Sequence, residues 1–228
     1  MIDFHTHILA NVDDGSQSLH ESLCMLQREQ EQGVEKIIAT PHFYAHRDTV
    51  SQFLFRREEA IRLLLQERQD ISVLIGAEVY YFPGIGKAEQ LSRLCVEGTS
   101  LLLLELPFAQ WTEQIGRDVA AILEKRKKTV LLAHIERYWE FQKDKSVWNR
   151  IFQMPVYAQI NTGSMKRKKK RKFADWFIRT GIPFVLGSDC HNLTERPPNL
   201  EEGRNYLGER YGSEVLKKLD ETEERLLK

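Results

Sequence analysis

The chain has 228 residues, of which 42% are hydrophobic and 29% are charged, and this balance predicts an ordinary globular protein with one sizeable core. Its 33 basic and 33 acidic residues cancel, so net charge indicates neither a nucleic acid nor any other charged partner. No basic stretch followed by an apolar one opens the sequence, and the longest aliphatic run, 101–104, is far shorter than the roughly 20 residues that span a bilayer. We therefore expect no signal peptide and no membrane insertion. The three cysteines are an odd, sparse set, which favours reduced thiols and a cytoplasmic location.

Seven short apolar segments, rich in Val, Ile and Leu, predict β-strands. They do not alternate strictly between apolar and polar residues, which is typical of parallel strands covered on both faces. Their midpoints are about 27 to 37 residues apart, the length of one strand–helix unit. The predicted strands are 2–5, 36–40, 72–77, 100–106, 129–133, 156–160 and 183–187.

Helical patterns fill most of the segments between these strands. The first helix follows Ser18, which forms a capping-box signature with Glu21, and Gly33 is a typical stop signal. Further helices are predicted at 53–68, 113–128, 173–180 and 200–227. Seven strand–helix units in a single domain, 1–228, predict an α/β fold, a closed or nearly closed (β/α)7 barrel. An open doubly wound sheet is the alternative.

Histidines and acidic residues follow six of the seven predicted strands, where each strand ends. In a parallel barrel these ends meet on one face, where active sites form. Burying so many carboxylates and imidazoles together is costly unless cations pair with them. The set is too large for one ion and suits two or three divalent ions; without thiolates it fits Mn, Fe, Mg or Zn and does not choose among them. Its members are His5, His7, Asp13 or Asp14, His42, Glu78, Glu105, His134, Asp189 and His191.

The order and spacing of these residues resemble the PHP superfamily, named for polymerase and histidinol phosphatase, over essentially the whole chain. Finer motifs resemble one branch, the bacterial tyrosine-protein phosphatases encoded with capsule or exopolysaccharide synthesis systems. The motifs are IDFHTHILANVDDG at 2–15, ATPHF at 39–43, GAEVY at 76–80, LLLELP at 102–107, AHIERY at 133–138 and GSDCHNLTERPP at 187–198. The resemblance implies a distorted (β/α)7 TIM-like barrel with a trinuclear metal site at the C-terminal ends of its strands.

The resemblance also implies roles for individual residues. Arg137 and Arg196 would hold the phosphate, because a guanidinium fork matches phosphate oxygens. Apart from the resemblance, we expect His42 or another group near the metals to protonate the leaving group, and Glu136 to support the metal site or a neighbouring base. Asp14 is preferred to its neighbour Asp13, although the sequence alone does not separate the two. The implied metal ligands are His5, His7, Asp14, His42, Glu78, Glu105, His134, Asp189 and His191, with Glu78 suited to bridge two ions.

The implied activity is manganese-dependent hydrolysis of protein phosphotyrosine, in which hydroxide generated at the metals attacks phosphorus. The expected partner is the phosphotyrosine-bearing tail of a bacterial tyrosine autokinase that regulates capsule or exopolysaccharide synthesis. A monomer is favoured. Aromatic residues near the strand ends would line the approach of the phenol, and the alternative for any one of them is packing at the rim. They are Phe43, Tyr44, Tyr80, Tyr81, Phe108 and Trp111.

A rival chemistry is present in the same sequence. Cys190 and Arg196 satisfy Cys-x5-Arg, the minimal pattern of the thiol-dependent tyrosine phosphatases. Such a loop needs small residues, so that backbone amides wrap the phosphate, and it should lead into a helix. Here the loop contains no glycine, and the two prolines after Arg196 disfavour a helix start at that point. A thiol mechanism would also leave the ring of histidines and acids unexplained.

Three further alternatives are open: a PHP hydrolase acting on a small molecule such as histidinol phosphate, a PHP nuclease, and a non-enzymatic metal-binding or scaffold protein. A nuclease would need a basic, aromatic groove on the metal face. The basic run KRKKKRK at 166–172 is too local to demand one. We expect this run to be a solvated, mobile surface loop, and the alternative is a contact with an acidic partner.

Overall fold

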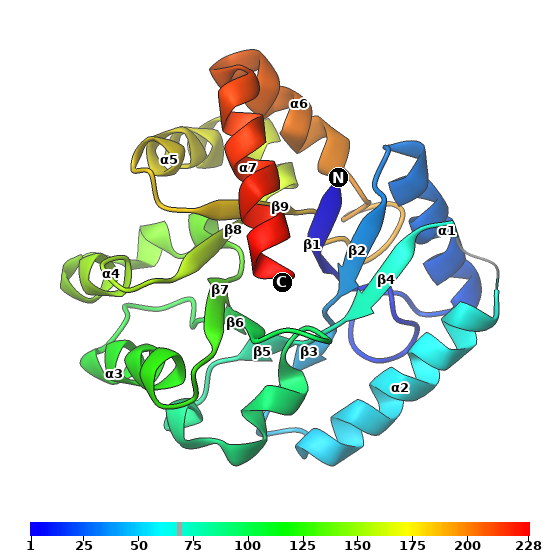
Figure 1. Ribbon diagram of the computed structural model, residues 1–228, viewed down its shortest axis with the longest axis horizontal. Coiled ribbons are helices and arrows are strands. Elements are labelled where there is room, and N and C mark those ends of the chain that lie inside the picture. Colours follow the sequence, from blue (N-terminus) through cyan, green and yellow to red (C-terminus); the bar gives the residue numbers. More distant parts are fainter. Residues whose placement is uncertain (68–69) are drawn as a thin grey trace.

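The computed structural model, drawn in Figure 1, describes residues 1–67 and 70–228 and is an α/β fold built on parallel strands. The strands are β1 (Ile2–Thr6), β2 (Lys36–Ala39), β3 (His42–Phe43), β4 (Ser72–Ile75), β5 (Glu78–Tyr80), β6 (Leu101–Glu105), β7 (Thr129–Leu132), β8 (Tyr157–Asn161) and β9 (Phe184–Gly187). They form a three-stranded sheet in the order β1-β2-β4 and a six-stranded sheet in the order β3-β5-β6-β7-β8-β9. Each of the seven predicted strands overlaps one of these strands.

The short strands β3 and β5 were not predicted, and they result from two breaks in the strand ladders. Pro41 follows the second predicted strand and ends its ladder, because proline has no amide hydrogen to donate. The third breaks at Gly76 and Ala77, after which the Glu78 amide donates to the carbonyls of Thr40 and Pro41. The chain thereby passes twice from the smaller sheet to the larger one, at residues that carry candidate ligands.

The last strand of the larger sheet lies beside the first strand of the smaller one. The Asp189 amide, just after β9, donates to the His5 carbonyl at 2.8 Å, and the His7 amide donates to the Cys190 carbonyl at 2.9 Å. Figure 1 shows the strands arranged around a common centre, with α1 to α6 on the outside and α7 crossing in front of β9 toward the centre. This arrangement brings the ends of β1 and β9 together.

The helices are α1 (Leu19–Glu31), α2 (Val50–Gln66), α3 (Glu113–Glu124), α4 (Ser146–Ile151), α5 (Lys168–Arg179), α6 (Leu200–Tyr211) and α7 (Ser213–Leu226). Ser18 caps α1 as predicted, but the Glu21 carboxylate accepts from the Gln17 amide rather than from Ser18. The helix predicted at 53–68 begins earlier, at a capping box formed by Thr49 and Gln52, and its last predicted residue, Arg68, lies outside the described residues. Helix α4 was not predicted.

The basic run 166–172 is largely exposed, as predicted, but the prediction that it forms a loop was wrong. Most of the run belongs to α5, which begins at Lys168 rather than at the predicted residue 173, and Lys166 ends a 3-10 helix, η5 (Thr162–Lys166). The apolar residues that follow, Phe173, Ala174 and Phe177, are buried and hold the helix against the core. Packing of its second half therefore extends the helix into the charged residues.

The C-terminal segment forms two helices rather than one, because Gly212 adopts a left-handed φ of 79° between α6 and α7. Helix α7 packs on α6 and β9 and buries Leu219, Glu223 and Leu226. Among the described residues, no helix has both the length and the apolar character that crossing a membrane requires.

Candidate metal centre

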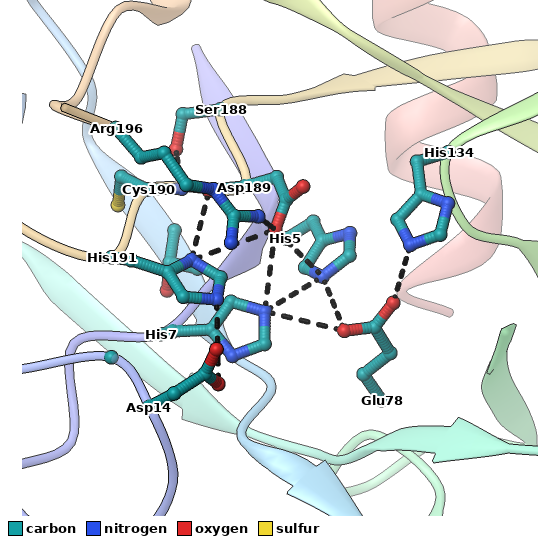
Figure 2. Close-up of polar contacts among 12 residues, drawn as sticks. His5, His7, Asp14, Glu78, His134, Ser188, Asp189, Cys190, His191 and Arg196 are labelled. Atoms are coloured by element: carbon teal, nitrogen blue, oxygen red, sulfur yellow. Dashed lines mark hydrogen bonds and ion pairs between the residues drawn. The ribbon is translucent and has the colours of Figure 1, made fainter. Parts of the chain in front are cut away.

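The predicted ligands converge at the C-terminal ends of the strands (Figure 2). Among the described residues, their nitrogen and oxygen atoms form three groups. Within each group, all of these atoms lie within 4.8 Å of one another. His7 belongs to two of the groups and His42 also belongs to two, so the groups adjoin. The groups are His7, Asp14, His42 and His191; His5, His7 and Asp189; and His42, Glu78 and Glu105. Eight of the nine predicted ligands are included.

Glu78 lies at the centre of this cluster. Its Oε2 atom is 3.0 Å from Nε2 of His5 and 3.0 Å from Nδ1 of His42. Its other oxygen, Oε1, is 2.7 Å from Nε2 of His134, the ninth predicted ligand. The two oxygens thus face opposite sides of the cluster, and Figure 2 shows His134 approaching from the side opposite His7. A carboxylate in this position is suited to link neighbouring cations.

Hydrogen bonds on the outer side of the cluster orient the imidazoles. Nδ1 of His5 lies 3.0 Å from Oε1 of Gln159, and Nδ1 of His7 lies 2.7 Å from Oδ2 of Asp13. Both acceptors favour a hydrogen on Nδ1, which leaves the lone pair of each Nε2 directed into the cluster. The two Nε2 atoms lie 3.0 Å apart. Histidines that bind metals are held in this way by a partner on the opposite ring nitrogen.

Asp13 and Asp14 occupy different environments. Besides His7, Asp13 accepts hydrogen bonds from the amides of Gly15 and His42 at 2.9 and 2.8 Å, so both of its oxygens are engaged. Asp14 instead directs Oδ1 toward His42 and His191, at 3.6 and 3.7 Å from their Nε2 atoms. Asp13 therefore supports a histidine, whereas Asp14 is the member of the pair that joins a ligand group.

Gly15 explains why this loop folds tightly over the site. A Cβ atom at this position would lie 2.1 Å from the His7 carbonyl oxygen and 2.5 Å from the His7 Cβ. The Ser16 amide donates to the same carbonyl at 3.0 Å. Any side chain at residue 15 would displace either the loop or His7.

The unpaired atoms of the cluster fit divalent cations. Within the described residues, buried polar atoms with no hydrogen-bond partner concentrate here: both oxygens of Glu78, Oε2 of Glu105, Nδ1 of His42, Nδ1 of His134 and Nε2 of His191. Leaving such atoms unsatisfied is costly in a folded protein. Mixed imidazole and carboxylate donors match Mn, Fe, Zn or Mg, and the donor set is therefore compatible with the expected metals.

The electrostatics of the cluster favour ionised carboxylates. Burial disfavours the charged form of Glu78, but the surrounding histidines, His5 above all, hold the pKa of this carboxyl well below its usual range. His5 and Arg137 likewise outweigh burial and hold the pKa of Asp189 well below its usual range. Ionised carboxylates are the form that binds divalent cations, so the charge state also fits a metal centre.

Two of the candidate ligands have strained backbones. His134 has φ 63° and ψ 73°, and Asp189 has φ 53°, which are left-handed conformations that residues other than glycine rarely adopt. Strain of this kind persists where the surrounding structure over-determines it, and it concentrates at functional sites.

Arg137 and Arg196 converge on Asp189. Nη2 of Arg137 lies 2.5 Å from Oδ2 of this carboxylate, and Nη2 of Arg196 lies 2.6 Å from Oδ1. Asn161 also donates to Oδ2, at 2.8 Å. Both arginines remain partly exposed and line a cavity of about 420 Å³ together with Asp189. The structure thus brings the two predicted arginines together at the edge of the metal cluster.

Cys190 is placed unfavourably for thiol chemistry. Its side chain is fully buried, and its sulfur lies 3.8 Å from Oε1 of Glu29, on the side away from the metal cluster (Figure 2). Burial, together with the charges of Glu29 and Asp3, raises the pKa of the thiol well above its usual range. A nucleophilic cysteine needs a lowered pKa and access to substrate, and Cys190 has neither.

The predicted aromatic residues divide into two sets. Tyr44 stacks on His42 with ring centroids 5.1 Å apart, and Phe108, 41% exposed, stacks on His134 at 5.9 Å. Tyr80 contacts Tyr44 and is also partly exposed. Phe43, Tyr81 and Trp111 do not line the approach but have the alternative role of packing, since they are buried in the core.

Three residues were given no supporting role from the sequence, where Asp13 was considered only as an alternative ligand to Asp14. Gln159 and Asn161 form a chain in which the Gln159 amide donates to Asn161 Oδ1 at 2.7 Å, and this chain links His5 to Asp189. Asp13 is the third. A glutamine in an otherwise apolar strand was the available signal, because a buried amide must find partners.

Comparison with known proteins agrees with this geometry. The family model described as capsular polysaccharide synthesis, CpsB/CapC, matches residues 1–227. The chain is 30% identical to the tyrosine-protein phosphatase CpsB of Streptococcus pneumoniae, with 96% of this chain and 94% of that protein aligned. It is also 30% identical to the tyrosine-protein phosphatase YwqE of Bacillus subtilis, over 100% of this chain and 92% of the relative.

Solved structures give the same result. The crystal structures of YwqE from B. subtilis and CpsB from S. pneumoniae, described as unique metal-dependent tyrosine phosphatases, include a chain that matches with a TM-score of 0.86 and 25% identity, covering 100% of this chain and 94% of that one. A histidinol phosphatase-type protein, hisK of Listeria monocytogenes, shares the fold with a TM-score of 0.50 at 15% identity, covering 84% of this chain and 95% of that one. The resemblance inferred from the motifs is confirmed, and the chain belongs to the CpsB/CapC family of capsular polysaccharide synthesis proteins.

Proposed function

We propose that this protein is a metal-dependent protein-tyrosine phosphatase. The observation that carries the proposal is that three groups of histidine and carboxylate atoms adjoin one another. Beside them, Arg137 and Arg196 both contact the carboxylate of Asp189. Relatives that align over nearly their whole length are named tyrosine-protein phosphatases. The ligands we assign are His5, His7, Asp14, His42, Glu78, Glu105, His134, Asp189 and His191, with two or three ions bound and manganese as the preferred metal.

Arg137 and Arg196 are the proposed phosphate-binding residues. Their guanidinium groups reach the same cavity, and each offers further N–H donors beyond the one directed at Asp189. Two guanidinium groups neutralise the equatorial oxygens, where the transition state of phosphoryl transfer concentrates its charge. Bound divalent ions would supply Lewis acidity toward the phosphate and would lower the pKa of a water molecule toward neutrality.

His42 is the proposed proton donor to the leaving phenolate. Its side chain is 11% exposed, at the rim of the cluster, and Tyr44 stacks on its ring. A phenol has a pKa near 10, so the leaving group needs little assistance from an acid. Tyr44, Tyr80 and Phe108 border the approach and would pack against the phenol ring.

The wider assignment follows from the same residues. We propose that the strands close into a distorted (β/α)7 barrel and that 1–228 is one domain. The hydrogen bonds between the ends of β1 and β9 support closure. We further propose that the protein acts in the cytoplasm as a monomer on the phosphorylated tail of a tyrosine kinase that regulates capsule or exopolysaccharide synthesis, since the family is one of capsular polysaccharide synthesis.

Phosphate release from a phosphotyrosine peptide tests this function. We expect chelation to abolish the initial rate and added Mn²⁺ to restore it, with Fe²⁺, Zn²⁺ and Mg²⁺ compared in parallel. Histidinol phosphate and a single-stranded oligonucleotide serve as control substrates. Faster turnover of histidinol phosphate would reassign the protein as a small-molecule phosphatase, and cleavage of the oligonucleotide would reassign it as a nuclease. A rate that survives complete metal removal would contradict the metal mechanism.

A further inference from the structure

A basic groove with aromatic residues in its wall lies next to the candidate active site. Its volume is about 710 Å³, and it runs between α5 and the segment containing the 3-10 helices η3 (Ile135–Arg137) and η4 (Trp139–Phe141). The rings of Trp139 and Trp176 lie 4.7 Å apart in its wall, and Trp176 is 44% exposed. Five lysines line it: Lys143, Lys145, Lys169, Lys170 and Lys172. We call it the lysine–tryptophan groove.

Not all of these charges are available to a ligand. The Nζ atom of Lys145 lies 3.4 Å from the centre of the Trp139 ring, and Lys169 forms an ion pair with Glu140 at 2.7 Å. Lys143 and Lys172 are exposed, and within the described part of the chain neither forms an ion pair. The groove therefore carries unpaired positive charge despite the two acids, Glu136 and Glu140, in its lining.

The groove adjoins the phosphate-binding cavity. Glu136 and Lys170 line both spaces, whereas Arg137 and Arg196 line only the cavity. A chain bound at the two arginines can therefore extend toward Lys143 and Lys172. An extended peptide advances about 3.3 Å per residue, so the groove accepts residues that closely flank the phosphotyrosine.

We propose that the lysine–tryptophan groove binds acidic side chains that flank the phosphotyrosine of the substrate on one side. This inference rests on the proposed phosphatase function and names the class of peptide that the site prefers. Carboxylates pair with Lys143 and Lys172, and the flat faces of Trp139 and Trp176 pack against the peptide. The chain has balanced charge overall, and the groove lining includes Glu136 and Glu140 beside its lysines, which favours a short acidic peptide over a nucleic acid.

The test compares peptides that differ only in flanking charge. The manganese-loaded protein is titrated with fluorescent peptides that carry a non-hydrolysable phosphonate in place of phosphotyrosine and either glutamate or glutamine residues beside it. Acidic residues are placed before the phosphonate in one series and after it in another. The double variant Lys143→Gln/Lys172→Gln is compared with Lys168→Gln/Lys217→Gln, which removes the same charge. Lys168 lies on the same helix but lines neither cavity, and Lys217 lies on α7.

We expect the wild-type protein to bind the acidic peptide more tightly in one of the two series. The groove variant should lose roughly 2- to 10-fold in affinity for that peptide, because each screened ion pair contributes modestly, and the control variant should not. The preference should weaken as salt is raised. An equal loss in both double variants, or no acidic preference in the wild type, overturns the inference. So does tighter, groove-dependent binding of a single-stranded oligonucleotide.

The result is separable from the proposed function. If acidic preference depends on the groove but no phosphotyrosine peptide is hydrolysed, the groove assignment stands as a binding site and the phosphatase assignment fails. If peptides are hydrolysed with the same kcat/KM whatever their flanking charge, the phosphatase assignment stands and the groove assignment fails.

Discussion

The carboxylate of Asp13 accepts a hydrogen bond from Nδ1 of His7 at 2.7 Å, and the same oxygen accepts the backbone amide of His42. One buried acid thus aligns two candidate ligands from different strands without joining a ligand group itself. The charge of Asp13 opposes the effect of burial on His7 and raises the pKa of that imidazole well above its usual range. Asp13 is therefore a positioning residue in the proposed centre.

Replacing Asp13 by asparagine should weaken metal binding. Loss of the charge removes the partner that holds His7, and changes of this kind typically cost about 10- to 100-fold in metal affinity. Titration calorimetry with Mn²⁺ measures this directly, with the exposed Asp144→Asn as the control. Unchanged affinity in Asp13→Asn, with normal folding by circular dichroism, would show that Asp13 does not position His7.

Conservative replacement of either arginine should impair catalysis while leaving metal binding intact. Lysine at position 137 or 196 keeps the positive charge but loses the planar fork. Loss of one charge-assisted hydrogen bond predicts a fall in kcat/KM of about 10- to 100-fold. Steady-state kinetics on a phosphotyrosine peptide, beside metal analysis of each variant, separates the two effects. Arg179→Lys, on the exposed end of α5, is the matched control. A variant with wild-type kcat/KM would remove that arginine from the phosphate site.

Cys190→Ala and Cys190→Ser should retain activity, to within about twofold, because the thiol is buried on the side away from the ligands and is held protonated. Initial rates with and without chelator are measured on both variants, at a temperature well below their unfolding transitions. Loss of activity in both folded variants, together with chelator resistance in the wild type, would revive the thiol mechanism.

Metal should stabilise the fold. A ligand at 100 times its Kd adds about 2.7 kcal/mol to the free energy of unfolding, which corresponds to a rise in Tm of roughly 5–10 °C for a chain of this size. Thermal melts with chelator and with excess Mn²⁺ measure the difference. Glu78→Gln should lose most of the shift, because Glu78 contacts both sides of the cluster. An identical Tm in both conditions would argue against a buried metal centre.

We expect Glu223, on α7, to make the free energy of unfolding depend on pH. Burial in α7 raises the pKa of this carboxyl to about 8, partly offset by Arg204. Because the folded pKa lies above the unfolded one, this group's contribution is fully present below about pH 4.5 and is lost as pH rises through about 8. Glu223→Gln should therefore be roughly 2–4 kcal/mol more stable than the wild type at pH 9 and similar at pH 4.5.

Urea unfolding at both pH values measures the effect of Glu223→Gln. The exposed neighbour Glu224, paired with Lys228, provides the control Glu224→Gln. Equal stability differences at the two pH values would show that Glu223 does not titrate near pH 8.

Several features were readable from the sequence because they are local. Apolar runs of four to seven residues predicted the principal strands, and polar residues placed directly after those runs predicted a site at the strand ends. Parallel strands bring their ends together whatever the details of packing, so ligands more than 180 residues apart, such as His5 and Asp189, were expected in one cluster.

Other features were decided only by the tertiary structure. Asp13 and Asp14 are adjacent and chemically identical, and only the fold of the loop around Gly15 separates their roles. It places Asp13 against Nδ1 of His7, as a support, and directs Asp14 toward Nε2 of His42, as a candidate ligand. The basic run became part of α5 because Phe173 and Phe177 are buried against residues distant in the sequence. Glu136 and Lys170, from segments that no sequence pattern relates, together line two adjoining cavities. Local patterns determined the strands and their chemistry, whereas side-chain direction and long-range packing determined which residues meet.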